Sequence, residues 1–434
     1  MNVAVVGAGP VGVASAVVYA LSGHRVVLVE RAGERLAALR SGRLPFHEEG
    51  LARAWVALAG AVDLVPDLGR VAHPGAVVVC VGTPSGAEGA ADLSQVEAVL
   101  GALDGVPPTV VVMRSTVPPG TGRRLAARLA PWGHGYAAHP EFLQEGTALE
   151  DSLRPTRVVI GADVPAVADL VAALAPGLGR PCLRVDVPTA EFIKIAANAH
   201  LAMRVSFINE MAQLCERLGA DIQRVAEGVG MDPRIGPAFL RAGLGYGGSC
   251  FPKDTRALSA LGRRLDADLP LLAAVIAVNA RQPQRCVARL AERLGGLQGR
   301  RVGVWGLAFK PGTDDVRESQ ALRLVEELAA RKAVVRVHDP LASAAVPLPP
   351  GVQRVDDPLR AASGAEAVVL ATEWPLYRTL DPLAVAAAME APRVLLDARN
   401  ALAPEPWAQA GVEYRGVGRP QAASLPALGA AVRG

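Results

Sequence analysis

A short segment around Cys250 contains the residues best suited to covalent chemistry. Four of the six residues from Gly243 to Gly248 are glycine, which lets the backbone approach a ligand closely. Pro252 is suited to the first turn of a helix, so Cys250 would lie at the positive end of that helix, where a thiol favours its nucleophilic thiolate form. Asp254 falls on the same helical side and could orient the thiol or a water molecule. The alternative is an inert cysteine buried in a tight loop.

A second set of polar residues occurs on a long helix that the pattern of residues 189–218 predicts. Lys194 and Asn198 are four residues apart and share one face, and Glu191 precedes them by one turn. The surrounding residues are mainly Ile, Ala and Phe, so this face either lines a site or reaches solvent. The sequence leaves both readings open.

The N-terminus contains a dinucleotide-binding pattern. Gly7-Ala8-Gly9-Pro10-Val11-Gly12 fits G-x-G-x-x-G between a predicted strand and a predicted helix, and such a turn presents the helix N-terminus to a pyrophosphate. Glu30 ends the next strand, where an acid binds the ribose diol and repels a 2′-phosphate, which favours NAD over NADP. Arg31 argues for NADP, because an arginine there can accept that phosphate. An ordinary glycine turn is the alternative.

Two loops complete the set of candidate sites. Residues 115–121 follow a predicted strand, at the carboxyl edge where open α/β sheets bind ligands. Residues 139–146 place Glu141 and Glu145 four apart, a spacing that suits a base and an anchor. The same two acids would also suit the first turn of a helix.

These residues need a scaffold, and the apolar pattern predicts one of the α/β class. Strands are expected at 2–6, 24–29, 76–81, 109–113, 301–305, 333–337, 366–371 and 393–397. Helices are expected at 10–21, 189–218, 270–294 and about 317–331. This alternation predicts two doubly wound Rossmann-like domains joined by a long central helical segment.

The predicted domain boundaries follow the change of pattern. Residues 1–186 form a dinucleotide-binding domain, 187–297 a central helical domain that carries Cys250, and 298–434 a second Rossmann-like domain. The apolar faces of the two long central helices would bury against each other or against a second subunit, and we predict a homodimer through this segment. The tail from about residue 418 is rich in Gly, Pro and Ala and is expected to be poorly ordered.

Composition excludes several classes of protein. The 434 residues carry a formal charge of only +3, and 4% are aromatic, which argues against a nucleic-acid-binding surface. No apolar run reaches the roughly 18 residues that span a bilayer, and the chain starts directly on a predicted strand, so we expect a cytoplasmic protein with no membrane partner. The five cysteines are never spaced as C-x-x-C, and no metal site is indicated.

Taken together, the ordered motifs resemble the UDP-glucose 6-dehydrogenase family, within the wider group of UDP-glucose and GDP-mannose dehydrogenases. The most specific is Gly-Gly-Ser-Cys-Phe-Pro-Lys-Asp at 247–254. The resemblance runs nearly end to end, through motifs at 7–12, 81–84, 115–121, 140–146, 191–198, 245–254, 308–319 and 397–400. It implies the oxidation of a sugar primary alcohol to a carboxylate with two NAD per nucleotide-diphosphate sugar, UDP-glucose above all.

The resemblance implies roles for the candidate residues. Cys250 would capture the aldehyde as a thiohemiacetal and then carry a thioester. Lys194 and Asn198 would stabilise the oxyanion, Glu141 would act as general base, and Thr116 and Asp254 would position a water. The implied cofactor-binding residues are Gly7, Gly9, Val11, Gly12, Glu30, Gly82, Thr83, Thr116, Glu145, Lys253 and Arg317. The implied substrate-binding residues are Glu141, Phe142, Leu143, Glu145, Lys194, Arg241, Tyr246, Gly247, Phe309, Lys310 and Arg399, with Arg241 supplied across a dimer.

Four positions depart from the usual family residues: Pro10 for an aromatic, Glu30 for Asp, His139 for Asn and Ala398 for Gly. None removes a group that the chemistry requires. Other readings stay open: the same chemistry on GDP-mannose, a UDP-N-acetylhexosamine or a dTDP-sugar, a two-electron hydroxyacid dehydrogenase with a structural Cys250, and a non-catalytic dinucleotide-binding scaffold.

Overall fold

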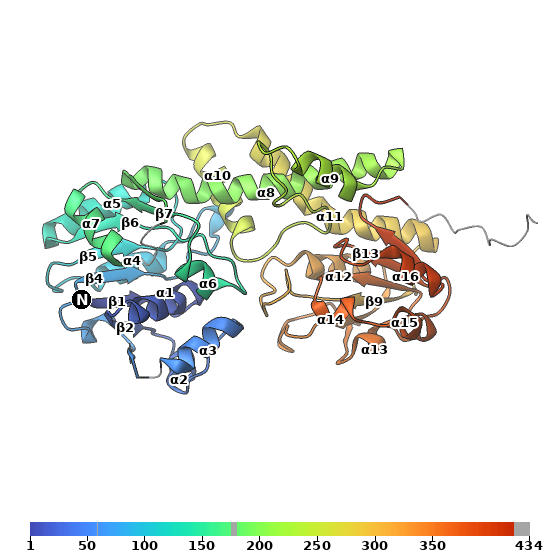
Figure 1. Cartoon of the computed structure of the whole chain (residues 1–434), viewed down its shortest axis with the longest axis horizontal. Helices are drawn as coiled ribbons and strands as arrows, with labels where there is room; N and C mark the ends of the chain where they lie inside the picture. Colours follow the sequence, from blue (N-terminus) through green and yellow to red (C-terminus); the bar gives the residue numbers. More distant parts are fainter. Residues whose placement is uncertain (59, 175–179, 421–434) are drawn as a thin grey trace, which may run out of the picture. The chain divides into compact units, whose positions relative to one another are not determined.

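The computed structural model describes residues 1–58, 60–174 and 180–420 (Figure 1). Contacts divide the chain into two compact units, the first made of residues 1–199 and 253–268 and the second of residues 200–252 and 269–434. Most of the tail that the sequence predicts to be poorly ordered, residues 421–434, lies outside the described residues.

The first unit contains an eight-stranded sheet. Its strands are β1 (Asn2–Val6), β2 (Arg25–Val29), β3 (Val62–Val65), β4 (Ala76–Val79), β5 (Val110–Met113), β6 (Gly135–Ala138), β7 (Val158–Gly161) and β8 (Cys182–Val185). They lie in the order β3-β2-β1-β4-β5-β6-β7-β8, which begins with the doubly wound order 3-2-1-4-5-6. All pairs are parallel except β6 with β7, which is antiparallel. All four residues of β4 are buried because parallel strands are covered on both faces.

Helices cover both faces of this sheet. They are α1 (Pro10–Leu21), α2 (Gly33–Arg40), α3 (Glu49–Ala57), α4 (Ser94–Gly101), α5 (Thr121–Leu129), α6 (Ala148–Leu153) and α7 (Pro165–Leu174). Val13 of α1 packs in one core cluster with Val3 and Val5 of β1. Leu125 of α5 packs in a second cluster with Ala4, the residue of β1 that points to the opposite face. The predicted Rossmann-like domain is confirmed.

The second unit contains a six-stranded parallel sheet. Its strands are β9 (Arg301–Trp305), β10 (Val334–His338), β11 (Gln353–Arg354), β12 (Ala367–Leu370), β13 (Val394–Asp397) and β14 (Glu413–Gly416). Their order, β11-β10-β9-β12-β13-β14, is again 3-2-1-4-5-6. The flanking helices are α12 (Gln320–Ala330), α13 (Pro358–Ala362), α14 (Pro375–Arg378), α15 (Pro382–Ala388) and α16 (Pro404–Gln409). Helix α12 begins at Gln320 rather than near 317, because Ser319 accepts the N–H of Ala321 as its N-cap.

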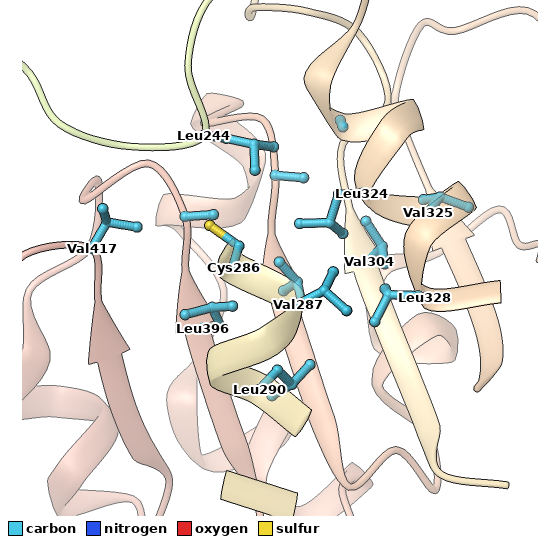
Figure 2. Packing of buried hydrophobic residues seen from close by; sticks show 14 of the residues in the cluster. Leu244, Cys286, Val287, Leu290, Val304, Leu324, Val325, Leu328, Leu396 and Val417 are labelled. Atoms are coloured by element: carbon cyan, nitrogen blue, oxygen red, sulfur yellow. The ribbon is translucent and has the colours of Figure 1, made fainter. Parts of the chain in front are cut away.

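The central segment is helical, as predicted, with α8 (Val187–Leu218), α9 (Ile222–Gly230), α10 (Phe251–Arg264) and α11 (Pro270–Leu294). Helix α11 packs on the second sheet through Val287 and Leu290, which belong to one buried cluster with Leu324 and Leu328 of α12 and Val304 of β9 (Figure 2). Helix α11 therefore belongs to the second unit, and the boundary between the two units falls within α8, between Ala199 and His200. A separate central domain at 187–297 stays a prediction. Among the described residues, no helix combines the length and the apolar character needed to cross a bilayer.

Candidate active site

The turn between β1 and α1 has the form of a dinucleotide cradle. Gly7 has a left-handed φ of +103°, and a side chain on Gly12 would overlap the carbonyl oxygen of Gly7. A Cβ on Gly9 would meet nothing within 4 Å, so the turn is open at the N-terminus of α1. The buried Glu30 carboxylate accepts the N–H of Ala8 at 3.1 Å and that of Ala32 at 2.8 Å. These residues fit a dinucleotide, with the acid beside the turn as predicted.

A hydrogen bond joins the loops that follow β4 and β5, next to this turn. Thr83, which follows β4 and Gly82, donates its hydroxyl to the carbonyl oxygen of Thr116 at 2.8 Å. The ammonium group of Lys253 lies 3.4 Å from the same Thr83 hydroxyl and 2.6 Å from the Asp254 carboxylate. Three residues predicted to contact the cofactor, Thr83, Thr116 and Lys253, are thus neighbours.

Lys194 and Glu141 form a buried ion pair, with Nζ 3.1 Å from Oε1. Their side chains are 4% and 8% exposed, which excludes the reading of Lys194 as part of a solvated helix face. The second carboxylate oxygen of Glu141 accepts the N–H of Leu143 at 2.6 Å. Phe142 lies beneath two cations, the guanidinium of Arg157 at 3.7 Å and the ammonium of Lys194 at 5.4 Å from its ring centre. A cation and a candidate base are therefore held side by side.

Asn198 and Asp254 form the second buried pair. The amide of Asn198 donates to the Asp254 carboxylate at 2.6 Å, and both side chains are buried. The described contacts of Asp254 are thus with Asn198 and Lys253, whereas the sequence suggested the Cys250 thiol or a water. Asp254 orients the amide of Asn198, so helix α10 fixes one of the predicted oxyanion donors on α8.

A small pocket lies between the loop after β5 and helix α8. It is lined by Met113, Ser115, Thr116, Val117, Ala138, Pro140, Glu191 and Lys194 and has room for about one water molecule. Glu191 accepts the N–H groups of Gly120 at 2.8 Å and Gly122 at 2.7 Å. Burial raises the pKa of its carboxyl group to about 7. The sequence located Glu191 one turn before Lys194 but gave it no role, because its partners lie far away in the chain.

The 139–146 segment is a loop and not a helix start, since α6 begins only at Ala148. His139 is buried, and its Nδ1 lies 2.9 Å from the carbonyl oxygen of Val159. Burial lowers the pKa of His139 to about 3, so the ring is neutral. Glu145 is half-buried on the same loop.

In the second unit, Cys250 immediately precedes α10, as predicted, and its sulfur lies 3.6 Å from the hydroxyl of Ser249. It is half-buried. All five cysteines lie within the described residues, and none forms a disulfide. Burial raises the pKa of Cys80 to about 12 and that of Cys286 to about 11, which disfavours their thiolates. Cys250 therefore combines partial exposure with a helix N-terminus.

The glycine segment before Cys250 is held by buried amides. Asn279 of α11 accepts the N–H of Tyr246 at 2.8 Å and donates to its carbonyl at 3.0 Å, and Gln320 donates to the same carbonyl at 3.0 Å. A Cβ on Gly247 would lie 2.5 Å from the carbonyl oxygen of Glu318. The glycines thus serve close packing within the unit.

Arg399 is predicted to lie near a diphosphate. In the structure its guanidinium donates hydrogen bonds to backbone carbonyl oxygens. It donates to the carbonyl oxygens of Ala371 at 2.6 Å, Gly245 at 3.1 Å and Phe309 at 3.1 Å, and it lies 3.5 Å from the Glu373 carboxylate. Its three backbone bonds join the glycine segment to the loop after β9. Sequence spacing gave no sign of this role.

The other predicted substrate and cofactor residues of the second unit surround this junction or lie on the surface. The ring of Phe309 is so close to Gly248 that a Cβ there would approach it to 2.7 Å, and Lys310 lies 5.9 Å from the ring centre. Arg317 is exposed and pairs with Asp315 at 2.6 Å, and Arg241 is exposed. Among the described residues, no group of three or more His, Cys, Asp or Glu is arranged to hold a metal ion.

Comparison with known proteins gives matches along most of this chain. Three domain models of the UDP-glucose/GDP-mannose dehydrogenase family match this chain: the NAD-binding domain at residues 1–175, the central domain at 188–281 and the UDP-binding domain at 303–404. The chain is 43% identical to the UDP-glucose 6-dehydrogenase of Pseudomonas aeruginosa, over 99% of this chain and 100% of that protein. The chain belongs to the UDP-glucose/GDP-mannose dehydrogenase family.

Solved structures of this family have the same fold. A UDP-glucose dehydrogenase from Pyrobaculum islandicum is 40% identical and superimposes with a TM-score of 0.89, covering 96% of this chain and 98% of that one. A UDP-D-ManNAc dehydrogenase from Pyrococcus horikoshii is 26% identical with a TM-score of 0.86, covering 96% and 99%. The family is therefore one in which related chains of this fold act on different nucleotide sugars.

Proposed function

We propose that this chain catalyses the NAD-dependent four-electron oxidation of UDP-glucose at C6 to UDP-glucuronate. The observation that carries the proposal is the end-to-end similarity to the Pseudomonas aeruginosa UDP-glucose 6-dehydrogenase. The buried Lys194–Glu141 and Asn198–Asp254 pairs and the placement of Cys250 at a helix N-terminus support it.

The chemistry proceeds in three stages. Removal of a hydride and a proton from the alcohol leaves an aldehyde. The Cys250 thiolate adds to the carbonyl carbon, and the oxygen takes up a proton to give a thiohemiacetal. Loss of a second hydride and the hydroxyl proton gives a thioester, which water hydrolyses to the carboxylate while sulfur leaves as thiolate. The turn from Gly7 to Gly12 and Glu30 would hold two NAD in succession, and NAD would supply the acceptor for each hydride.

The chain's own residues hold the charges that develop. Lys194 and Asn198 would stabilise oxygen as it gains negative charge, and their partners Glu141 and Asp254 would keep both donors in place. Glu141 would also act as the general base that accepts a proton released in the reaction. The pocket beside Thr116 has room for about one water molecule, which suits the proposed positioning of a water by Thr116. The role of Asp254 in positioning a water is proposed from the resemblance.

Binding roles are proposed for the remaining predicted residues. Gly7, Gly9, Val11, Gly12, Glu30, Gly82, Thr83, Glu145, Lys253 and Arg317 would contact the cofactor. Phe142, Leu143, Arg241, Tyr246, Gly247, Phe309, Lys310 and Arg399 would contact the nucleotide sugar. The matched family models support a division into NAD-binding, central and sugar-nucleotide domains near the predicted boundaries.

We also propose a homodimer in the cytoplasm. Large apolar side chains are exposed on α8, which supports burial against a second copy. Five cysteines without a disulfide suit a reducing compartment.

Counting NADH tests the proposal. Purified protein with limiting UDP-glucose and excess NAD is expected to form two NADH per sugar consumed. One NADH per sugar would support the two-electron hydroxyacid dehydrogenase, and none would support the scaffold. The similarity to the Pyrococcus horikoshii UDP-D-ManNAc dehydrogenase favours a second candidate, the same oxidation of a UDP-N-acetylhexosamine. A panel of UDP-glucose, UDP-N-acetylhexosamines, dTDP-glucose and GDP-mannose, ranked by kcat/KM, decides between substrates.

A further inference from the structure

Glu191 links two elements that both carry predicted active-site residues. It lies near the start of α8 with only 4% of its surface exposed, one turn before Lys194. Its Oε2 accepts the N–H of Gly120 and its Oε1 that of Gly122. These glycines mark the point where the loop after β5 becomes helix α5. The carboxylate therefore bridges α8 to the beginning of α5.

The backbone at this junction is adapted to the carboxylate. Gly120 has a left-handed φ of +89°, which favours glycine. A Cβ on Gly122 would lie 2.6 Å from Oε1 of Glu191 and 2.7 Å from the ring of Tyr136, so only a residue without a side chain fits. Both glycines thus allow the backbone N–H groups to reach Glu191.

The same loop carries Thr116. Thr116 lines the small pocket together with Glu191 and Lys194, and its carbonyl oxygen accepts the hydroxyl of Thr83. The loop is therefore fixed at one end by Thr83 and at the other by Glu191. Releasing either end would let Thr116 move relative to Lys194.

We propose that Glu191 is a positioning residue of the dehydrogenase reaction, whose carboxylate holds the Thr116 loop against helix α8 so that Thr116 and Lys194 face one pocket. The proposal rests on the proposed function. It adds a residue for which the sequence gave no role, one that acts through Thr116 and not on the substrate.

The ionisation of Glu191 makes this role depend on pH. The groups that face it are Arg123 from α5, Tyr136 from β6 and, one turn along its own helix, Lys194. Burial raises its pKa to about 7, against the opposing effect of the two N–H donors and Arg123. Above that pH the carboxylate accepts both N–H groups. Below it, one oxygen carries a proton and accepts poorly, so the loop is held less firmly.

Stability and activity should then depend on pH in opposite directions. Because the pKa of Glu191 is above its ordinary value of 4.5, the folded protein binds a proton that the unfolded chain has released. The contribution of Glu191 to stability is therefore largest below pH 4.5 and declines as the pH rises toward about 7. Its positioning role requires the ionised form and increases over the range around pH 7. A purely structural role would make activity follow stability.

The test compares Glu191→Gln with a matched control, Asp186→Asn. Gln offers one oxygen, so one N–H loses its acceptor, and its amide does not titrate. Asp186 precedes the same helix, is exposed and accepts the N–H of Thr189. It lies 3.9 Å from the guanidinium of Arg123 on α5, so the control changes the charge beside Glu191 but leaves both N–H bonds of Glu191 in place. We expect the ratio of wild-type to Glu191→Gln kcat/KM with UDP-glucose to be about tenfold at pH 8.5, the loss of roughly one charge-assisted hydrogen bond, and to approach one below pH 6. Asp186→Asn should stay within about twofold of wild type at every pH.

A ratio that is constant with pH, or that follows the unfolding free energy measured at each pH, would overturn the proposal. Hydrogen exchange of the wild-type protein provides a test that needs neither a variant nor turnover. After correction for intrinsic rates, the amides of Gly120 and Gly122 should lose protection as the pH falls from 8 to 6, and unchanged protection would also overturn it. Wild-type protein that forms no NADH from UDP-glucose but shows this loss would remove the proposed substrate and leave the Glu191 link standing.

Discussion

At the scale of single residues, the surroundings of the five cysteines determine which can act as a nucleophile. Cys80, Cys215 and Cys286 are buried, and burial raises the pKa of each thiol, so thiolate is scarce at neutral pH. Cys182 is exposed at the start of β8, and Cys250 lies at the N-terminus of α10. Among these, Cys250 has the helix dipole that stabilises a thiolate.

Replacing Cys250 by serine should abolish steady-state turnover. An alkoxide leaves an acyl intermediate far less readily than a thiolate, so we expect kcat to fall by roughly 10³-fold or more, about 4 kcal/mol in the barrier. NADH release with saturating UDP-glucose measures this loss, and intact-protein mass spectrometry should detect the sugar acyl group on the variant. Cys182→Ser is the matched control and should keep full activity. A Cys250→Ser variant that turns over normally would rule out the covalent mechanism.

At the scale of elements, the glycine segment before Cys250 depends on helix α11. Asn279 satisfies both backbone groups of Tyr246, and Arg399 and Gln320 hold carbonyl oxygens of the same segment. A segment with so many glycines would otherwise have high conformational freedom. Helix α11 therefore provides the rigidity that the glycines themselves lack.

Asn279→Leu should remove that support while keeping a side chain of similar branched shape. The variant leaves the N–H of Tyr246 buried without its acceptor, and we expect the free energy of unfolding to fall by about 2–4 kcal/mol. Urea denaturation measures the loss, and kcat/KM should fall with it at temperatures where the variant remains folded. Gln284→Leu, an exposed position on the same helix, should change stability by less than about 0.5 kcal/mol. Equal effects at the two positions would contradict the role of Asn279.

The sequence predicted the elements and several site residues because their signals are local. The turn from Gly7 to Gly12, the shared face of Lys194 and Asn198, and the helix after Cys250 each follow from residues a few positions apart. The contact partners of these side chains could not be predicted from the sequence. Glu141 contacts Lys194, Asp254 contacts Asn198, and Glu191 contacts Gly122 only once the chain has folded. Those contacts depend on tertiary packing, for which periodicity and capping give no information.

At the scale of the whole molecule, one topology occurs twice. Both sheets contain the order 3-2-1-4-5-6, and in both an acid follows the second strand and accepts N–H groups from the turn after the first: Glu30 does so for Ala8, and Asp339 for Leu307 and Ala308. Glu30 also accepts the N–H of Ala32, whereas Asp339 accepts three further donors: the N–H groups of Leu341 and Ala342 and the indole of Trp374. The Asp339 carboxylate is therefore already hydrogen-bonded to backbone and to Trp374. This agrees with the match of the NAD-binding family model to residues 1–175 of the first unit.

The proposed function includes a homodimer, in which Arg241 of one copy would act at the site of the other. Phe207, Leu214 and Leu218 are exposed on α8, and their spacing of seven and four residues places them on one face. Three large apolar side chains in a row are costly to leave in water, and the chemistry that suits such a face is the identical face of a second copy. Arg241, predicted to act across the dimer, is likewise exposed in the same unit.

We therefore expect a dimer in sedimentation velocity at micromolar concentration and a monomer for the Phe207→Glu/Leu214→Glu double variant, because each carboxylate would have to be buried unpaired in the interface. Leu383→Glu, which adds the same charge at an exposed leucine on α15, should remain dimeric. If Arg241 acts across the interface, the monomeric variant should lose most of its activity with UDP-glucose while retaining wild-type affinity for NADH, because the cofactor turn lies within one chain. A double variant that remains dimeric would show that this face of α8 is not the interface, and a fully active monomer would show that Arg241 is not needed from a partner.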